Sequence, residues 1–149
     1  MVTQIKPATM ERTESQSSAK EEDNYDELEA EDEVYIRDAY LVFRSFCNLS
    51  TKVLPTEQLY EVRGQPMRSK LISLHLIHTL MNNNITVFTS PLCTIRNSRT
   101  NEVTTFIQAI KYYICLSVTR NGASSVDGIF NVCAEIFWLV LKFMREQFK

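Results

Sequence analysis

The apolar residues of this chain recur at three- and four-residue steps over most of its length, and this spacing constrains the fold more than any other feature. Such a period is typical of amphipathic helices. Turn residues are scarce, because the 149 residues include only three glycines and four prolines. A many-stranded sheet needs more turn chemistry than that. The sequence therefore predicts an all-α fold.

The first two main helices are expected at about residues 34–50 and 66–81. The first has an expected buried stripe at Tyr35, Ala39, Val42, Phe46 and Leu49. The second begins at Pro66, which suits a first helical turn because no amide donor is needed there. Its apolar residues lie on two faces, so we expect a central helix covered on both sides.

Two further main helices are expected at about residues 101–119 and 124–149. The third ends at Asn121 and Gly122, residues that commonly close a helix. Its predicted buried face consists of Val103, Phe106, Ile107, Ile110, Tyr113, Ile114 and Ser117. The fourth has a predicted buried stripe of Ile129, Val132, Cys133, Ile136, Val140 and Phe143. Phe137, Trp138 and Leu141 lie outside this stripe. A helix with such extra apolar surface needs more cover than three predecessors give, as in stacked helical repeats.

The N-terminal residues differ sharply from the rest in charge. The first 33 residues carry eleven acidic and three basic side chains, a net charge of −8, whereas the other 116 carry a net charge of +6. A segment so acidic and so poor in apolar residues cannot offset the entropy lost on ordering. We therefore predict a disordered acidic tail over residues 1–32 and a helical body over residues 33–149. The acidic run could bind a basic partner, although a solvated linker is the commoner role.

Residues 1–30 lack the apolar stretch of a secretory signal. The longest apolar run, Ile136–Leu141, is far shorter than the roughly 20 residues of a membrane span. We therefore expect a cytoplasmic protein. We also expect its cysteines to be free thiols, since no two of them have a metal-binding or redox spacing. The cysteines are Cys47, Cys93, Cys115 and Cys133.

Catalytic and metal-binding patterns are sparse. His75 and His78 are three residues apart on the second helix and could present two metal ligands, but no third ligand accompanies them. No nucleophile has a base nearby in the sequence, and the three glycines are isolated rather than gathered in a phosphate-binding loop. We expect no cofactor, no metal and no enzymatic activity.

Six residues are candidate contacts for a partner or a lipid headgroup. Basic side chains cluster near the start of the second helix and again before the third, where they could meet phosphates. The charge of the body is too modest to predict nucleic-acid binding. One of two adjacent tyrosines is expected to pack and the other to face a partner. The candidates are Arg63, Arg68, Lys70, Arg96, Arg99 and Tyr112.

Four strings of residues resemble successive blocks in the N-terminal regulatory region of the large trans-Golgi Arf guanine-nucleotide exchange factors, the brefeldin-A-inhibited class. They are Arg37–Ser45 (RDAYLVFRS), Met67–Leu74 (MRSKLISL), Phe106–Cys115 (FIQAIKYYIC) and Asn121–Val126 (NGASSV). Their order and gaps are similar to those of the family, and the resemblance covers about residues 35–149. It places the body where the dimerisation and cyclophilin-binding region passes into the domain upstream of the catalytic one, known together as the DCB-HUS region.

The resemblance implies an armadillo-like stack of about four main helices. It also implies a cytoplasmic protein peripheral to Golgi membranes, acting in vesicle-mediated transport. In this family the region serves autoinhibition, self-association and recruitment by small GTPases of the Arf and Rab type, or contacts other segments of the exchange factor. The family's Asn-Tyr-Asp-Cys motif and its catalytic domain are absent from these residues. Two alternatives stay open: a truncated helical fragment without autonomous activity, and a weak anionic-lipid-binding module that uses Arg63 and Lys70.

Overall fold

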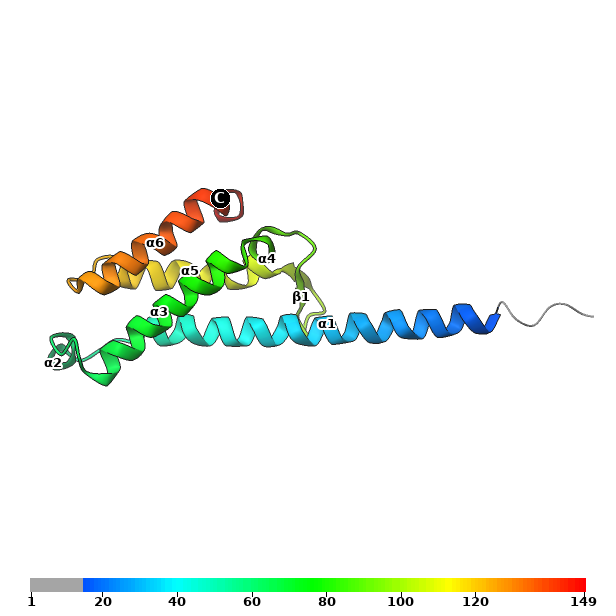
Figure 1. Cartoon of the computed structure of the whole chain (residues 1–149), viewed down its shortest axis with the longest axis horizontal. Helices are drawn as coiled ribbons and strands as arrows, with labels where there is room; N and C mark the ends of the chain where they lie inside the picture. Colours follow the sequence, from blue (N-terminus) through cyan, green and yellow to red (C-terminus); the bar gives the residue numbers. More distant parts are fainter. Residues whose placement is uncertain (1–14) are drawn as a thin grey trace, which may run out of the picture. The chain divides into compact units, whose positions relative to one another are not determined.

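The computed structural model of this protein describes residues 15–149, with side chains described from residue 31 onward. In chain order the elements are α1 (Ser15–Ser50), α2 (Thr56–Leu59), α3 (Gln65–Asn83), α4 (Ile85–Thr89), β1 (Thr94–Arg96), β2 (Val103–Thr105), α5 (Phe106–Asn121), α6 (Asp127–Phe143) and the 3₁₀ helix η1 (Arg145–Phe148). Four of these helices, α1, α3, α5 and α6, are long (Figure 1). The prediction of an all-α stack of about four main helices is confirmed.

The chain divides into two units, Met1–Val34 and Tyr35–Lys149. Within the first unit, the predicted disordered tail is helical from Ser15 onward, as the beginning of α1. Its Glu, Lys and Ala residues have good helix propensity, a local preference that the prediction from low apolar content did not take into account. Residues 1–14 of the predicted tail lie outside the described residues, and for them disorder stays a prediction.

The second unit is a stack in which α3 and α5 lie between the last turns of α1 and helix α6 (Figure 1). Leu74 and Ile77 of α3 are fully buried, as are Ile110 of α5 and Ile136 of α6. Helix α3 packs mainly on α6, and α5 packs on α6 from another side. The predicted buried face of α5 is largely confirmed.

The buried face of α1 differs from the predicted stripe. Phe43 and Cys47 are buried, whereas four residues of the predicted stripe are exposed, namely Tyr35, Ala39, Val42 and Leu49. The apolar residues of α1 span an arc wider than one stripe. The rest of the stack covers the edge of this arc that carries Phe43 and Cys47, and it leaves the edge that carries Val42 and Leu49 open. Phe46, between the two edges, is partly buried.

Helix α3 also has less cover than predicted. Its buried face includes Met67, Leu74 and Met81. Its second apolar face begins with Ile72 and Leu76, and both side chains are exposed. The expectation of cover on both faces is therefore wrong for the described residues, although the central position of α3 is confirmed.

A short hairpin replaces the predicted start of the third helix. Strand β1 pairs with β2 in antiparallel register, with Thr94 opposite Thr105 and Arg96 opposite Val103. Asn101 in the connecting loop has a φ of 60°, a left-handed conformation that asparagine tolerates. The β-branched residues of β2 favour an extended backbone. Helix α5 therefore begins at Phe106, five residues later than predicted.

Three phenylalanines join α1, α4 and α5. The ring centroids of Phe43 and Phe88 are 5.4 Å apart, and those of Phe88 and Phe106 are also 5.4 Å apart in an edge-on arrangement. Such pairs stabilise by about 0.5–1.5 kcal/mol beyond the area they bury. The contact anchors the C-terminal part of α1.

Hydrogen bonds fix the C-terminal end of α1 to α5. Asn121 donates to the backbone oxygen of Ser50 over 3.0 Å, and the Ser50 hydroxyl lies 2.9 Å from that of Ser117. All three residues are buried. Arg120 donates to the backbone oxygen of Thr51 over 3.1 Å. The last carbonyls of α1, which have no partner within the helix, are satisfied in this way.

Replacement of Leu74 by alanine should lower the free energy of unfolding by about 2–5 kcal/mol, because it leaves a cavity in a closely packed site. Leu74 is 0% exposed, whereas Ile72 is 55% exposed in the same helix. Ile72→Ala is therefore a matched control and should change stability by less than about 0.5 kcal/mol. Urea denaturation followed by circular dichroism measures both, and equal losses would contradict the assigned face of α3.

The Asn121→Ala variant should lose about 1–3 kcal/mol of stability, because the buried carbonyl of Ser50 then lacks its donor. Asn48→Ala serves as the control, since this asparagine is exposed on α1. Thermal unfolding of the two variants should separate them by several degrees. A melting temperature for Asn121→Ala equal to that of the wild type would show that the network contributes nothing.

Candidate interaction surfaces

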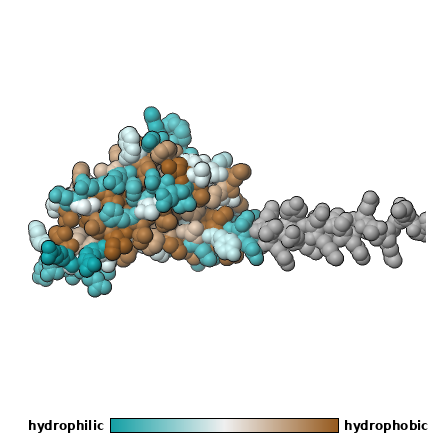
Figure 2. All heavy atoms as spheres, viewed as in Figure 1, coloured by the Kyte–Doolittle hydropathy of each residue, from teal (hydrophilic) through white to brown (hydrophobic). Residues whose placement is uncertain are grey.

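Two separate cavities lie between α1 and α3, one near each end of α3. One cavity, of about 240 Å³, lies where α1 ends and α3 begins, and is lined by Leu49, Lys52, Leu54, Gln65, Pro66, Ser69 and Lys70. The other, of about 290 Å³, is lined by Ala39, Val42, Phe43, Leu80, Asn84, Val87, Phe88 and Phe106. Most of the lining is apolar, and Figure 2 shows apolar residues reaching the surface of the body. Cavities with such linings suit apolar side chains of a partner better than a charged substrate.

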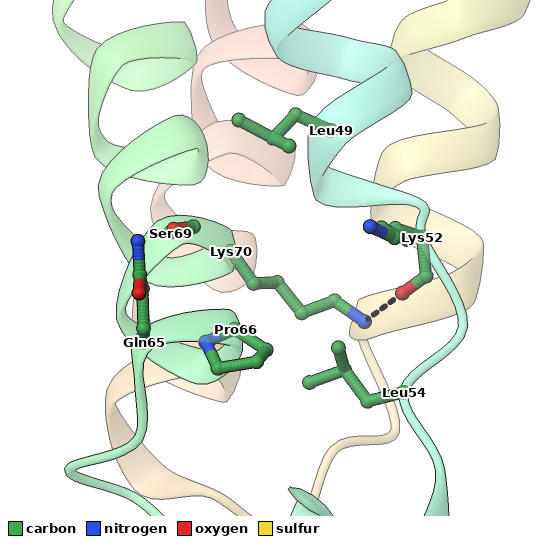
Figure 3. A pocket seen from close by; sticks show the side chains of 7 residues that line it. All are labelled: Leu49, Lys52, Leu54, Gln65, Pro66, Ser69 and Lys70. Carbon is green, nitrogen blue, oxygen red and sulfur yellow. Dashed lines mark hydrogen bonds between the residues drawn. The ribbon is translucent and has the colours of Figure 1, made fainter.

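Lys70 is turned inward rather than toward solvent. Its ammonium donates to the backbone oxygen of Lys52 over 3.2 Å, as the dashed line in Figure 3 shows. Burial lowers the pKa of Lys70 below its ordinary value. Lys70 and Arg120 together place two cations at the C-terminal end of α1. Their positive charge interacts favourably with the negative end of the helix dipole. Lys70 therefore has a structural role that competes with lipid or partner binding.

The other predicted basic contacts do not form one surface. Arg63 and Arg68 are exposed near the beginning of α3, whereas Arg96 and Arg99 are exposed on the hairpin that follows α4. The 19 residues of α3 give it a length of roughly 28 Å, and it separates the two groups. The guanidinium of Arg96 lies 3.5 Å from the Asn101 side-chain oxygen. Binding by these residues stays a prediction.

The adjacent tyrosines divide as expected. Tyr112 is exposed, while Tyr113 is half-buried beneath the guanidinium of Arg44, which lies 5.6 Å from its ring. Burial, followed by the neighbouring Tyr40, raises the pKa of Tyr113. The two tyrosine rings meet edge-on at 5.6 Å. Tyr112 is thus an exposed aromatic side chain held in place by a rigid neighbour, while its contact with a partner stays a prediction.

Helix α6 carries the apolar surface that the candidate residues did not include. Phe130, Phe137, Trp138 and Leu141 are 50%, 51%, 61% and 47% exposed, respectively. The sequence signal was a position outside the predicted buried stripe. The structure confirms this position for Phe137, Trp138 and Leu141. Phe143 was placed on the buried stripe, yet it is exposed, with the Lys142 ammonium 4.8 Å from its ring. The described residues leave this face of α6 uncovered.

The described residues contain no group of three His, Cys, Asp or Glu side chains that could hold a metal ion. His78 lies 3.7 Å from Glu135 on α6, and His75 is exposed, so the structure does not bring the two histidines to a shared ligand. All four cysteines are free thiols. No helix in the described part of the chain is long and apolar enough to cross a membrane.

Comparisons with known proteins identify the body of the chain. Residues 35–149 match the family model described as the HUS domain of Mon2/Sec7/BIG1-like proteins. The chain is 41% identical over 114 residues to the ADP-ribosylation factor guanine nucleotide-exchange factor sec71 of Schizosaccharomyces pombe. It is 36% identical over 113 residues to the factor SEC7 of Saccharomyces cerevisiae. It is 37% identical over 113 residues to the brefeldin A-inhibited guanine nucleotide-exchange protein 1 of Rattus norvegicus.

Each of these matches covers 76% of this chain but only 5–6% of the relative. The chain therefore spans a small fraction of the length of the curated relatives it matches. The matched residues begin at Tyr35 and extend to Lys149, which is the whole second unit of the structure. The resemblance found in the four strings of residues is thus confirmed, and the chain belongs to the HUS-domain family of Mon2/Sec7/BIG1-like Arf exchange factors.

Proposed function

We infer that this chain is a non-catalytic regulatory and interaction module of a large Arf guanine-nucleotide exchange factor. The single observation that supports this most is the exposed apolar face of α6 on a well-packed helical stack, to which the two mainly apolar cavities between α1 and α3 add further open apolar surface. Soluble proteins rarely expose apolar patches of that kind without a partner. A helical stack presents such surfaces on rigid elements, which suits binding.

The partners we propose are small GTPases of the Arf or Rab type, other segments of the parent exchange factor, or a second copy of the chain. Relatives at 36–41% identity carry names that describe exchange on ADP-ribosylation factor, which supports a role close to such GTPases. Through these contacts the module would contribute to autoinhibition, self-association or GTPase-dependent recruitment. The proposed setting is the cytoplasmic side of Golgi membranes, in vesicle-mediated protein transport.

A non-catalytic role is consistent with the state of the thiols, the only strongly nucleophilic groups in the body. Burial raises the pKa of Cys47 to about 12 and that of Cys133 to about 11. A thiol attacks only as its thiolate, so neither group is reactive at neutral pH. Cys115 is exposed but has no histidine on its own helix to act as a base.

Alkylation with iodoacetamide at a pH of about 8 should therefore modify Cys115 first and Cys93 more slowly, because thiol reactivity depends on the thiolate fraction and on access. Cys47 and Cys133 should react only after denaturant is added. Peptide mass spectrometry over a time course gives the order. Rapid modification of Cys133 in the folded chain would show an activated thiol and would contradict a purely non-catalytic role.

The binding role is tested with the purified chain immobilised and exposed to Arf and Rab GTPases, each loaded with GDP or with a non-hydrolysable GTP analogue. We expect retention of at least one GTPase in the GTP form, several-fold above the GDP form, because recruitment requires recognition of the active state. Tyr112→Ala and the double variant Arg63→Glu/Arg68→Glu test the candidate contacts. The loss of retention without a change in melting temperature would locate the contact.

The same preparation needs a thermal melt, because the open apolar surfaces also favour an alternative in which the chain is a fragment that does not fold stably alone. A cooperative transition contradicts that alternative. A folded chain that retains neither nucleotide form, and no segment of a parent exchange factor, would contradict the proposed function.

A further inference from the structure

The cavity of about 240 Å³ between the end of α1 and the start of α3 combines apolar walls with cationic side chains. Leu49, Leu54 and Pro66 form the apolar walls, and among the described residues the only charged ones in the lining are Lys52 and Lys70. Figure 3 shows the Lys70 side chain extending from α3 toward the loop after α1, with Leu49 on one side of it and Pro66 on the other. The cavity therefore presents an ammonium beside apolar surface.

Lys70 has no acidic partner within the part of the chain whose side chains are described. Its ammonium donates to the backbone oxygen of Lys52 over 3.2 Å. An ammonium carries three donors, so two remain for another acceptor. Burial lowers the pKa of Lys70, and the nearby Arg120 guanidinium lowers it further. The Cys133 thiol also lies near, but it is uncharged at neutral pH because burial raises its pKa to about 11. A carboxylate bound in the cavity would supply the counter-charge that Lys70 lacks.

The size of the cavity suits one large side chain of a partner protein. Pockets that enclose a whole small molecule have volumes of roughly 300–1,000 Å³, and this cavity is smaller. Apolar surface continues at its border, because Leu49 is 43% exposed and Val53, between two lining residues in the sequence, is 79% exposed. A protein segment could cover this border while one of its side chains fills the cavity. Anchor residues that are buried in this way supply most of the affinity of many protein interfaces.

The charges around the cavity favour an acidic segment. Residues 51–70 carry four basic and two acidic side chains, a net charge of +2. Arg120 adds a further cation at the same loop, where it donates to the backbone oxygen of Thr51. The two acidic residues, Glu57 and Glu61, are exposed and do not line the cavity. A carboxylate has two oxygens to satisfy, whereas a phosphate headgroup has more, and the apolar walls provide no donors for them. A carboxylate therefore fits the cavity better than a lipid phosphate does.

We propose that this cavity binds a segment of a partner protein in which a large apolar side chain stands beside an acidic one. The apolar side chain fills the space between Leu49, Leu54 and Pro66, and the carboxylate accepts hydrogen bonds from the ammonium of Lys70. The bond from Lys70 to Lys52 uses one of three donors, so it limits this binding without preventing it. The proposal deepens the proposed interaction role and rests on it, and it adds a site and the chemistry of the partner.

Peptide titrations of the full chain, labelled with nitrogen-15, test the site by NMR. The probe is a short blocked peptide with a central phenylalanine between glutamates, in a background of glycine and serine. We expect amide shifts that saturate and cluster at residues 49–54 and 65–70, with a dissociation constant of about 0.1–1 mM, because one anchor and one ion pair give modest affinity. Two matched peptides separate these contributions. Lysines in place of the glutamates, or alanine in place of the phenylalanine, should each weaken binding about tenfold or more.

Variants of the chain locate the contact. Lys70→Met removes the ammonium but keeps an apolar stem, and it should weaken binding of the glutamate peptide about tenfold, since charge-assisted hydrogen bonds are the strong ones. Lys142→Met is the matched control, because this exposed lysine lies on α6, and it should bind as the wild type does. Ser69→Phe fills the cavity from α3 and should abolish binding without removing a charge. Circular dichroism melts show whether each variant is folded, and the comparison of the three peptides on the wild type needs no variant.

The absence of clustered shifts with the glutamate peptide at up to about 5 mM would overturn the proposal, since even weak specific binding is detected at that concentration. Equal binding of the three peptides, or binding that Ser69→Phe leaves unchanged, would overturn it as well, because another surface would then be responsible. Lys70-dependent sedimentation with phosphatidylserine vesicles, in a chain that binds no peptide, would assign these cations to lipid instead.

The GTPase retention assay separates this proposal from the proposed function. A chain that binds no peptide but still retains a GTPase overturns the site alone and leaves the proposed function standing. A folded chain that binds the glutamate peptide as expected, yet retains no GTPase and no segment of a parent exchange factor, supports the site and contradicts the proposed function.

Discussion

The buried hydrogen bonds of Asn121 and Ser117 with Ser50 determine how the rest of the body is arranged. Ser50 is the last residue of α1, so these bonds fix both the end and the rotation of that helix against α5. A helix end buried without such partners would leave its final carbonyls unsatisfied, at a cost of about 1–3 kcal/mol each. With the rotation fixed, Phe43 reaches Phe88, and Val42 lines the cavity beside them.

Much of the fold could be predicted because periodicity is a local property. The start of α3 follows from Pro66, the end of α5 from Asn121, and the buried face of α5 from apolar spacing. The rotation of α1 could not be predicted, because its apolar arc is wide and only contacts distant in sequence select one edge. Asn121 was interpreted as a helix terminator, and its side-chain bond to Ser50, 71 residues away, has no local signal. The hairpin of β1 and β2 was missed because each strand has only three residues.

The types of residue in the candidate site could be predicted from the sequence, but their positions in the fold could not. Clusters of arginine and lysine can be found in the sequence, yet only the structure shows that Lys70 donates to a backbone carbonyl and that Arg63 and Arg99 lie at different ends of α3. The apolar residues of α6 did have a signal, since Trp138 and Leu141 lay outside the buried stripe. Their position shows that the helices of the predicted stack do not cover these residues. It does not identify what covers them.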